Sequence, residues 1–153
     1  KQIIQQREFK LTAILLTHTH PDHIADLEQL VTETSCEAVF SPEQEPLERA
    51  QSFPQGKSFH AGQLTVNSFL TCGHSPSGTT YDVDGLDRSV AVVGDALFAG
   101  SMGGPKISYQ DALQTNRKSI FSLSEDTILC PGHGPLTTVG EEKIHNPFFP
   151  EFK

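Results

Sequence analysis

The sequence predicts a mixed α/β fold in a single domain that spans residues 1–153. Short apolar runs typical of buried strands alternate with segments whose apolar residues recur at helical spacing. A length of 153 residues suits one domain, and 36% apolar residues are enough for a hydrophobic core. No linker, internal repeat or low-complexity segment divides the sequence.

Four segments of the first half carry patterns of regular structure, in the order helix, strand, helix and strand: residues 1–8, 11–16, 24–34 and 37–40. The strands are short apolar runs, LTAILL and EAVF, bounded by polar residues. The longer helix is indicated by Ile24, Leu27 and Val31, which share one helical face. Pro42 then predicts the start of a short helix that ends at about Ala50, because proline suits the first helical turn.

The second half is predicted to contain several strands and two helices. We expect a loop with a strand edge over residues 51–62, a strand over 63–70 and a hairpin of the strands 79–83 and 89–93. A glycine-rich loop over 96–107 follows, then a helix over 108–123, a strand over 127–130 and a short helix from 138 onward. An Asp-Gly pair suits the hairpin turn. Both helix starts rest on capping boxes, Ser108 with Asp111 and Thr138 with Glu141.

The acidic composition and the cysteines restrict the partners and the compartment of the protein. A net charge of −8 argues against a nucleic-acid partner and against an anionic membrane surface. No apolar run approaches the length that spans a membrane. Cys36, Cys72 and Cys130 are widely spaced and form no C-x-x-C pair, so a reducing compartment, the cytoplasm, is predicted.

Three histidines and an aspartate lie close together in the segment THTHPDH, directly after the first predicted strand. His18 and His20 are two residues apart, so an extended chain points both side chains to the same side. A turn at Pro21 then brings Asp22 and His23 toward the same volume. Imidazole and carboxylate groups suit zinc, iron or manganese. The alternative is a polar turn with solvated side chains, for which this spacing of ligand-type residues would be a coincidence.

Three further ligand-type residues follow predicted strands at sudden loops: His74, Asp95 and His133. Each of them alone would be an ordinary loop residue. In open α/β folds, however, groups at strand ends converge on one edge of the sheet. We therefore predict that these residues and the THTHPDH segment form one metal site.

These segments resemble the metallo-β-lactamase superfamily. The resemblance rests on THTHPDH, on GH at 73–74, on GD at 94–95 and on GHG at 132–134, which occur in the order typical of the family. The ending CPGHGPLTTVGEEKIHNPFF and the loop GDALFAGSMGG are most similar to the glyoxalase II-like, or hydroxyacylglutathione hydrolase-like, members. The similarity extends over nearly the whole chain, from about residue 11 to residue 149.

The resemblance implies seven metal ligands, three for a first ion, three for a second and one that bridges them: His18, His20 and His74; Asp22, His23 and His133; and Asp95. Five imidazoles and two carboxylates are too many for one tetrahedral ion and fit a pair of ions. We therefore expect two divalent metal ions as cofactors, with zinc as the first choice and iron or manganese as alternatives.

The resemblance further implies a dinuclear hydrolase of thioesters such as hydroxyacylglutathione, acting by attack of a metal-bridging hydroxide. Asp22 and Asp95 are the expected catalytic residues, and the partner is a small-molecule thioester or ester; a homo-oligomer remains open. One alternative is a persulfide dioxygenase, which holds a single iron with two histidines and an aspartate. Its relatives tend to show Arg-Thr-Asp after the GD loop, where this chain has GGPKIS. The other alternative is a non-catalytic metal-binding scaffold.

The resemblance also implies the αββα sandwich of the family, in which several strands precede the histidine segment. Only about ten residues precede residue 11 here, so roughly four strands of the first sheet are expected to be missing. The chain is therefore expected to be N-terminally incomplete, with an exposed apolar edge and face. The C-terminal helical region that binds glutathione in full glyoxalase II enzymes is also expected to be absent.

Overall fold

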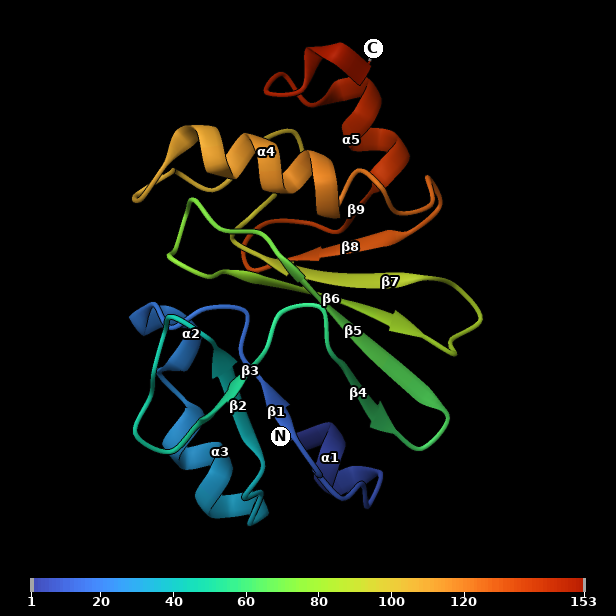
Figure 1. The fold of residues 1–153 in the computed structure, drawn as a ribbon. Helices are drawn as coiled ribbons and strands as arrows, with labels where there is room; N and C mark the ends of the chain where they lie inside the picture. Colours follow the sequence, from blue (N-terminus) through green and yellow to red (C-terminus); the bar gives the residue numbers. More distant parts are fainter. Residues whose placement is uncertain (1, 153) are drawn as a thin grey trace.

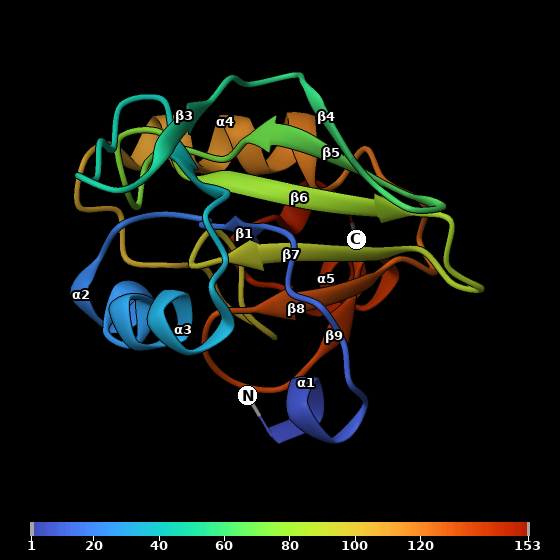
Figure 2. The same cartoon turned by 90° about the horizontal axis from the view of Figure 1, so that it is seen from below.

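Two β-sheets lie face to face in the computed structural model, which describes residues 2–152 (Figure 1). The smaller sheet has three parallel strands in the order β1-β2-β3: Ile14–Leu15, Val39–Pro42 and Gln51–Phe53. The larger sheet has six strands in sequence order, β4 to β9: Ser58–Ala61, Leu64–Leu70, Thr79–Asp84, Val90–Gly94, Ile128–Pro131 and Thr137–Thr138. Figure 2 shows β5 to β8 side by side.

Helices lie on the outer sides of the two sheets, so that the layers run helix, sheet, sheet, helix (Figure 1). Two helices accompany the smaller sheet, α2 (Pro21–Ile24) and α3 (Leu27–Thr34). The larger sheet carries α4 (Tyr109–Ser119) and α5 (Val139–His145) on its outer side. Two shorter elements lie near the ends of the chain: the helix α1 (Gln2–Gln6) and the 3₁₀ turn η1 (Pro150–Phe152). This is the predicted αββα arrangement.

Three hydrophobic clusters hold these layers together. The largest joins the outer face of the six-stranded sheet to α4 and α5 and includes Val93, Ile120 and Phe149. A second joins the smaller sheet to α3 through Val39 and Leu27. The third lies between the sheets, where strands of both contribute one face: Leu15, Phe40, Phe53, Phe59, Val66, Tyr81 and Val83. Adjacent residues of a strand therefore enter different clusters, as the period of two requires.

Most of the predicted elements are confirmed, and several bounds change. Both predicted N-caps form, since Ser108 Oγ accepts a hydrogen bond from Asp111 N and Thr138 Oγ1 accepts one from Glu141 N, each at 3.2 Å. The strand predicted over residues 11–16 is reduced to β1. The helix predicted over 24–34 is observed as α3, which begins at Leu27, and the turn predicted at Pro21 is the short helix α2. The loop predicted over 51–62 contains β3 and β4, and β9 was not predicted.

The helix predicted from Pro42 to Ala50 is wrong. Pro42 is the last residue of β2 and pairs with Phe53, and the following residues form turns. The Glu45 side chain accepts hydrogen bonds from Thr19 and Ser77, which lie far away in the sequence. These tertiary contacts outweigh the local preference for a helix. In residues 2–152, no helix is long and apolar enough to cross a membrane.

Candidate metal centre

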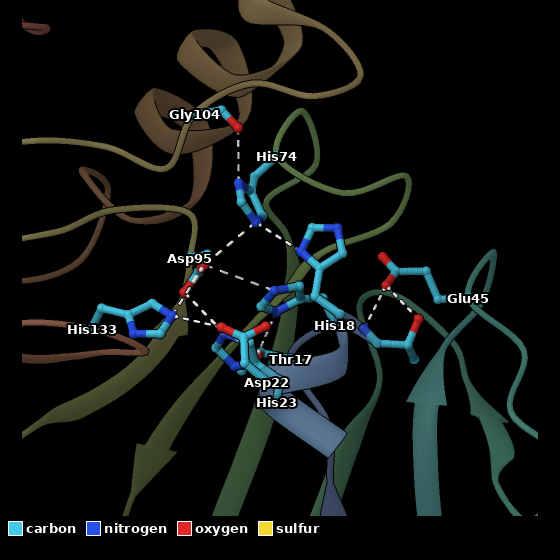
Figure 3. A network of polar contacts seen from close by, with 11 residues as sticks. Thr17, His18, Asp22, His23, Glu45, His74, Asp95, Gly104 and His133 are labelled. Carbon is cyan, nitrogen blue, oxygen red and sulfur yellow. Dashed lines mark hydrogen bonds and ion pairs between the residues drawn. The ribbon is translucent and has the colours of Figure 1, made fainter. Parts of the chain in front are cut away.

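The seven predicted ligands lie together at one end of the two sheets, in loops that follow strands and in the short helix α2. Figure 3 labels all of them except His20. Since β5, β7 and β8 run in the same direction, their carboxyl ends share one edge of the larger sheet. His74, Asp95 and His133 follow these three strands. The smaller sheet delivers the remaining four ligands through the loop after β1 and the helix α2. This convergence confirms the predicted proximity.

The first trio consists of His18, His20 and His74, whose ligand atoms lie within 4.8 Å of one another. His74 Nε2 lies 3.0 Å from His20 Nδ1. His74 Nδ1 lies 2.9 Å from the carbonyl oxygen of Gly104, and a carbonyl can only accept a hydrogen bond. Neutral His74 therefore carries its proton on Nδ1, which leaves the lone pair of Nε2 directed into the trio.

The second trio consists of Asp22, His23 and His133, and it is much more open to solvent. Its shortest contact joins His133 Nε2 to Asp22 Oδ2 at 3.1 Å. More than half of each of these two side chains is exposed, 56% for His133 and 59% for Asp22, whereas His18 is 2% exposed. A ligand from solution therefore reaches the centre from the side of the second trio.

Asp95 lies between the two trios. Its Oδ1 is 3.3 Å from Nε2 of His23, and its Oδ2 is 3.4 Å from Nε2 of His74 and 3.7 Å from Nε2 of His133. The Asp95 side chain is buried, and Asp95 directly follows Gly94, the last residue of β7. One side chain thus lies close to members of both trios.

Three buried polar atoms at this centre have no hydrogen-bond partner: His18 Nε2, His23 Nε2 and Asp95 Oδ1. Buried polar atoms are normally paired, because an unpaired one costs free energy. Imidazole nitrogens and carboxylate oxygens are suitable metal ligands, and here they converge without hydrogen bonds. The cluster therefore fits a metal site.

Burial and neighbouring charges shift the pKa values at the centre. The pKa of His18 is lowered to about 4, chiefly by burial and then by the nearby His23. Burial, followed by the Lys106 ammonium, also lowers the pKa of His20. A hydrogen bond from its own backbone lowers the pKa of Asp22. These shifts favour neutral imidazoles and an ionised carboxylate, which are the metal-binding forms.

Several supporting groups surround the ligands, and most were not predicted. Thr17 directly precedes His18, and its Oγ1 lies 3.2 Å from the Nδ1 of that histidine. Gly104 and the buried carboxylate of Glu45 were missed, although both bind residues of the centre. No local pattern marks them, because their partners are 26 or more residues away in the sequence. Gly132, the first glycine of GHG, was named only as part of that motif, and no role at the centre was predicted for it.

Comparison with known families agrees with this geometry. The sequence profile of the Metallo-beta-lactamase superfamily matches residues 1–133. The chain is 28% identical to hydroxyacylglutathione hydrolase GloC of Haemophilus influenzae, covering 96% of this chain and 80% of that protein. It is 33% identical to a probable metallo-hydrolase of Streptococcus pyogenes, covering 95% of this chain and 74% of that protein.

Solved structures share the fold. The structure of ETHE1 from Myxococcus xanthus has a TM-score of 0.83 and 25% sequence identity, covering 95% of this chain and 66% of that one. The structure of TTHA1623 in a di-iron-bound form has a TM-score of 0.74 and 25% identity, covering 96% of this chain and 82% of that one.

Proposed function

Because this chain belongs to the Metallo-beta-lactamase superfamily, we propose that it is a dinuclear metal-dependent hydrolase of thioesters. The position of Asp95 carries the proposal. Its two carboxylate oxygens face His23 of the second trio and His74 of the first, at 3.3 and 3.4 Å. A single-ion site has no need for a carboxylate between two sets of three ligands. The di-iron form of TTHA1623, a structural relative, supports a pair of ions.

The residues of the centre would hold two divalent ions, one at each trio, with Asp95 shared between them. Such a pair lowers the pKa of water toward about 7 and stabilises the negative charge that develops on a carbonyl oxygen. Asp22 lies on the exposed side, and its lowered pKa keeps the carboxylate ionised. It accepts a hydrogen bond from the attacking water and orients it toward the substrate.

In the proposed reaction, water attacks the carbonyl carbon of the thioester and the C–S bond breaks. The attacking water gives one proton to the solvent, the thiolate leaves with the electron pair of the C–S bond, and the carboxylic acid that forms releases the second proton. A thiolate is a good leaving group, so no strong general acid is required. Hydroxyacylglutathione is the first candidate substrate, because the relative from Haemophilus influenzae is a hydroxyacylglutathione hydrolase. Other thioesters and esters suit the same chemistry.

A second candidate function is a mononuclear iron persulfide dioxygenase. One observation favours it: two imidazoles and a carboxylate, those of His18, His23 and Asp95, also lie within 4.8 Å of one another. The dinuclear proposal accounts for more of the centre, because it also uses His20, His74, Asp22 and His133. We retain zinc as the first choice of metal, with iron and manganese as alternatives.

We also propose a cytoplasmic protein that acts on small molecules. All three cysteines are unpaired, which supports a reducing compartment. The net charge of −8 supports a protein that binds neither nucleic acid nor an anionic membrane.

Metal analysis combined with a thioester panel tests the proposed function. Protein purified without added metal should contain two zinc, iron or manganese ions per chain and should hydrolyse hydroxyacyl thioesters. The Asp95→Ala variant should lose both metal and activity. Asp87→Ala makes the same change at an exposed aspartate, and this variant should keep both. One iron per chain with persulfide oxidation would instead support the dioxygenase. Full metal content and rate in Asp95→Ala would contradict the proposed role of this carboxylate.

A further inference from the structure

The carboxylate of Glu45 connects the two loops that supply the first trio. Its Oε2 accepts hydrogen bonds from the backbone N–H and the hydroxyl of Thr19, at 2.8 and 3.1 Å. Its Oε1 accepts a hydrogen bond from the backbone N–H of Ser77 at 3.1 Å. Figure 3 shows Glu45 beside the histidine loop. Three segments that are distant in sequence therefore meet at one side chain.

The partners of Glu45 are placed beside metal ligands. Thr19 lies between His18 and His20, so a hydrogen bond to its backbone constrains both neighbours. Ser77 lies three residues after His74 in the tight turn that follows β5. Further hydrogen bonds hold this turn in place. Ser77 Oγ accepts from the backbone N–H of Gln44 at 2.9 Å, and the backbone N–H of Thr79 donates to the carbonyl of Thr17 at 2.8 Å.

Glu45 is an unusual residue at this position, because it is buried with 6% exposure. In residues 2–152, no lysine, arginine or histidine forms an ion pair with it. Burying a carboxylate is costly unless several donors compensate for the lost water. Here three donors do so, and all three belong to the loops that carry the first trio. The carboxylate is therefore directed at these loops and not at an opposite charge.

We propose that Glu45 is a positioning residue that sets the geometry of the first trio and thereby its affinity for metal. It does so by fixing the separation between the loop of His18 and His20 and the loop of His74. Nothing comparable ties Glu45 to the second trio, since within residues 2–152 the hydrogen bonds of its carboxylate go to Thr19 and Ser77. Loss of the carboxylate should therefore weaken one metal position and spare the other. This inference rests on the proposed binding of two ions.

The decisive variant is Glu45→Gln, which keeps the size of the side chain. An amide has one acceptor oxygen and one donor nitrogen, so either Ser77 N–H or Thr19 N–H would face another donor. Replacing an outer group that orients a metal ligand typically lowers the metal affinity by about 10- to 100-fold. We expect a loss of this size at the first trio. Thr19→Val removes only the hydroxyl donor and should give a smaller loss.

The test is a titration of the metal-free protein with cobalt(II), followed by visible absorption and by calorimetry. The variants His74→Ala and His133→Ala assign the two binding steps to the first and second trio. Glu43→Gln is the matched control, because Glu43 is exposed and lies two residues away. Thermal unfolding of each metal-free variant is recorded in parallel, to separate ligand positioning from a general loss of stability.

A selective loss of the first step in Glu45→Gln, with the second step and the Glu43→Gln control unchanged, would support the inference. An unchanged first step would overturn it. Equal weakening of both steps together with lower stability of the metal-free protein would also overturn it, since Glu45 would then have only a general structural role. If the wild-type protein shows no second step, the proposed dinuclear function fails as well, so the two failures can be told apart.

Discussion

Gly132 packs directly against the carboxylate of Asp95. A methyl group at Gly132 would overlap with Oδ1 of Asp95 and would lie 2.6 Å from Cε1 of His23. The residue is held in place by a hydrogen bond from its N–H to the carbonyl oxygen of Gly94 at 2.9 Å. The loop after β8 thus approaches the loop after β7 so closely that only glycine fits.

Replacing Gly132 with alanine should therefore weaken metal binding while the chain still folds. The added methyl group must displace Asp95 or His23, both of which are predicted ligands. We expect a loss of about 10- to 100-fold in metal affinity, measured by calorimetric titration with zinc. Gly62→Ala is the control for metal affinity, because Gly62 lies between β4 and β5, away from the centre, and a methyl group there meets open space. Equal affinity of Gly132→Ala and wild type would show that the loop adapts without moving a ligand.

Acidification should destabilise the metal-free protein through His18. The folded protein lowers the pKa of this histidine from 6.5 to about 4, so the unfolded chain binds the proton more tightly. The stability that neutral His18 contributes is complete above about pH 6.5 and is lost progressively as the pH falls toward about 4. Urea unfolding at a series of pH values measures this loss.

The variant His18→Asn should reduce the slope of stability against pH in that range. His60→Asn provides the comparison, because His60 is exposed and lies outside the metal centre. A slope that is the same in His18→Asn as in wild type would assign the acid sensitivity to other groups.

Metal removal should lower the thermal stability of the wild-type protein. Each ion that binds only the folded state stabilises it by mass action, by about 2.7 kcal/mol at a hundredfold excess over the dissociation constant. For a chain of this size, each ion therefore corresponds to a rise in Tm of about 5 to 10 °C when zinc is restored after chelation. Differential scanning calorimetry measures the change. Asp95→Ala should show a much smaller response, and an equal response would place the stabilising ion elsewhere.

Tyr81 should stabilise the contact between the two sheets. Its buried hydroxyl donates a hydrogen bond to the carbonyl oxygen of Leu16, just after β1, at 2.9 Å. Tyr81→Phe leaves that carbonyl without this partner and should lower the free energy of unfolding by about 1 to 3 kcal/mol. The only other tyrosine, Tyr109, is exposed, so Tyr109→Phe should have little effect. Chemical denaturation of both variants compares them directly, and equal stabilities would contradict the role of the hydroxyl.

Local patterns were sufficient for much of the fold and for naming the residues that converge on the candidate metal centre. The caps at Ser108 and Thr138 could be predicted, because each bonds a backbone group three residues ahead. The strands β5 to β8 follow from apolar runs and turns. The helix predicted from Pro42 to Ala50 failed, because this segment is shaped by hydrogen bonds to distant loops.

The sequence by itself determined the α/β class and the residue types of the metal centre, since apolar periodicity and imidazole or carboxylate chemistry are local properties. The tertiary structure alone decided that the first trio is the more buried one and the second the more open one, and that Glu45 joins two of the loops. These relationships depend on strand order and on the packing of two sheets. Both arise from contacts between residues that are far apart in the sequence.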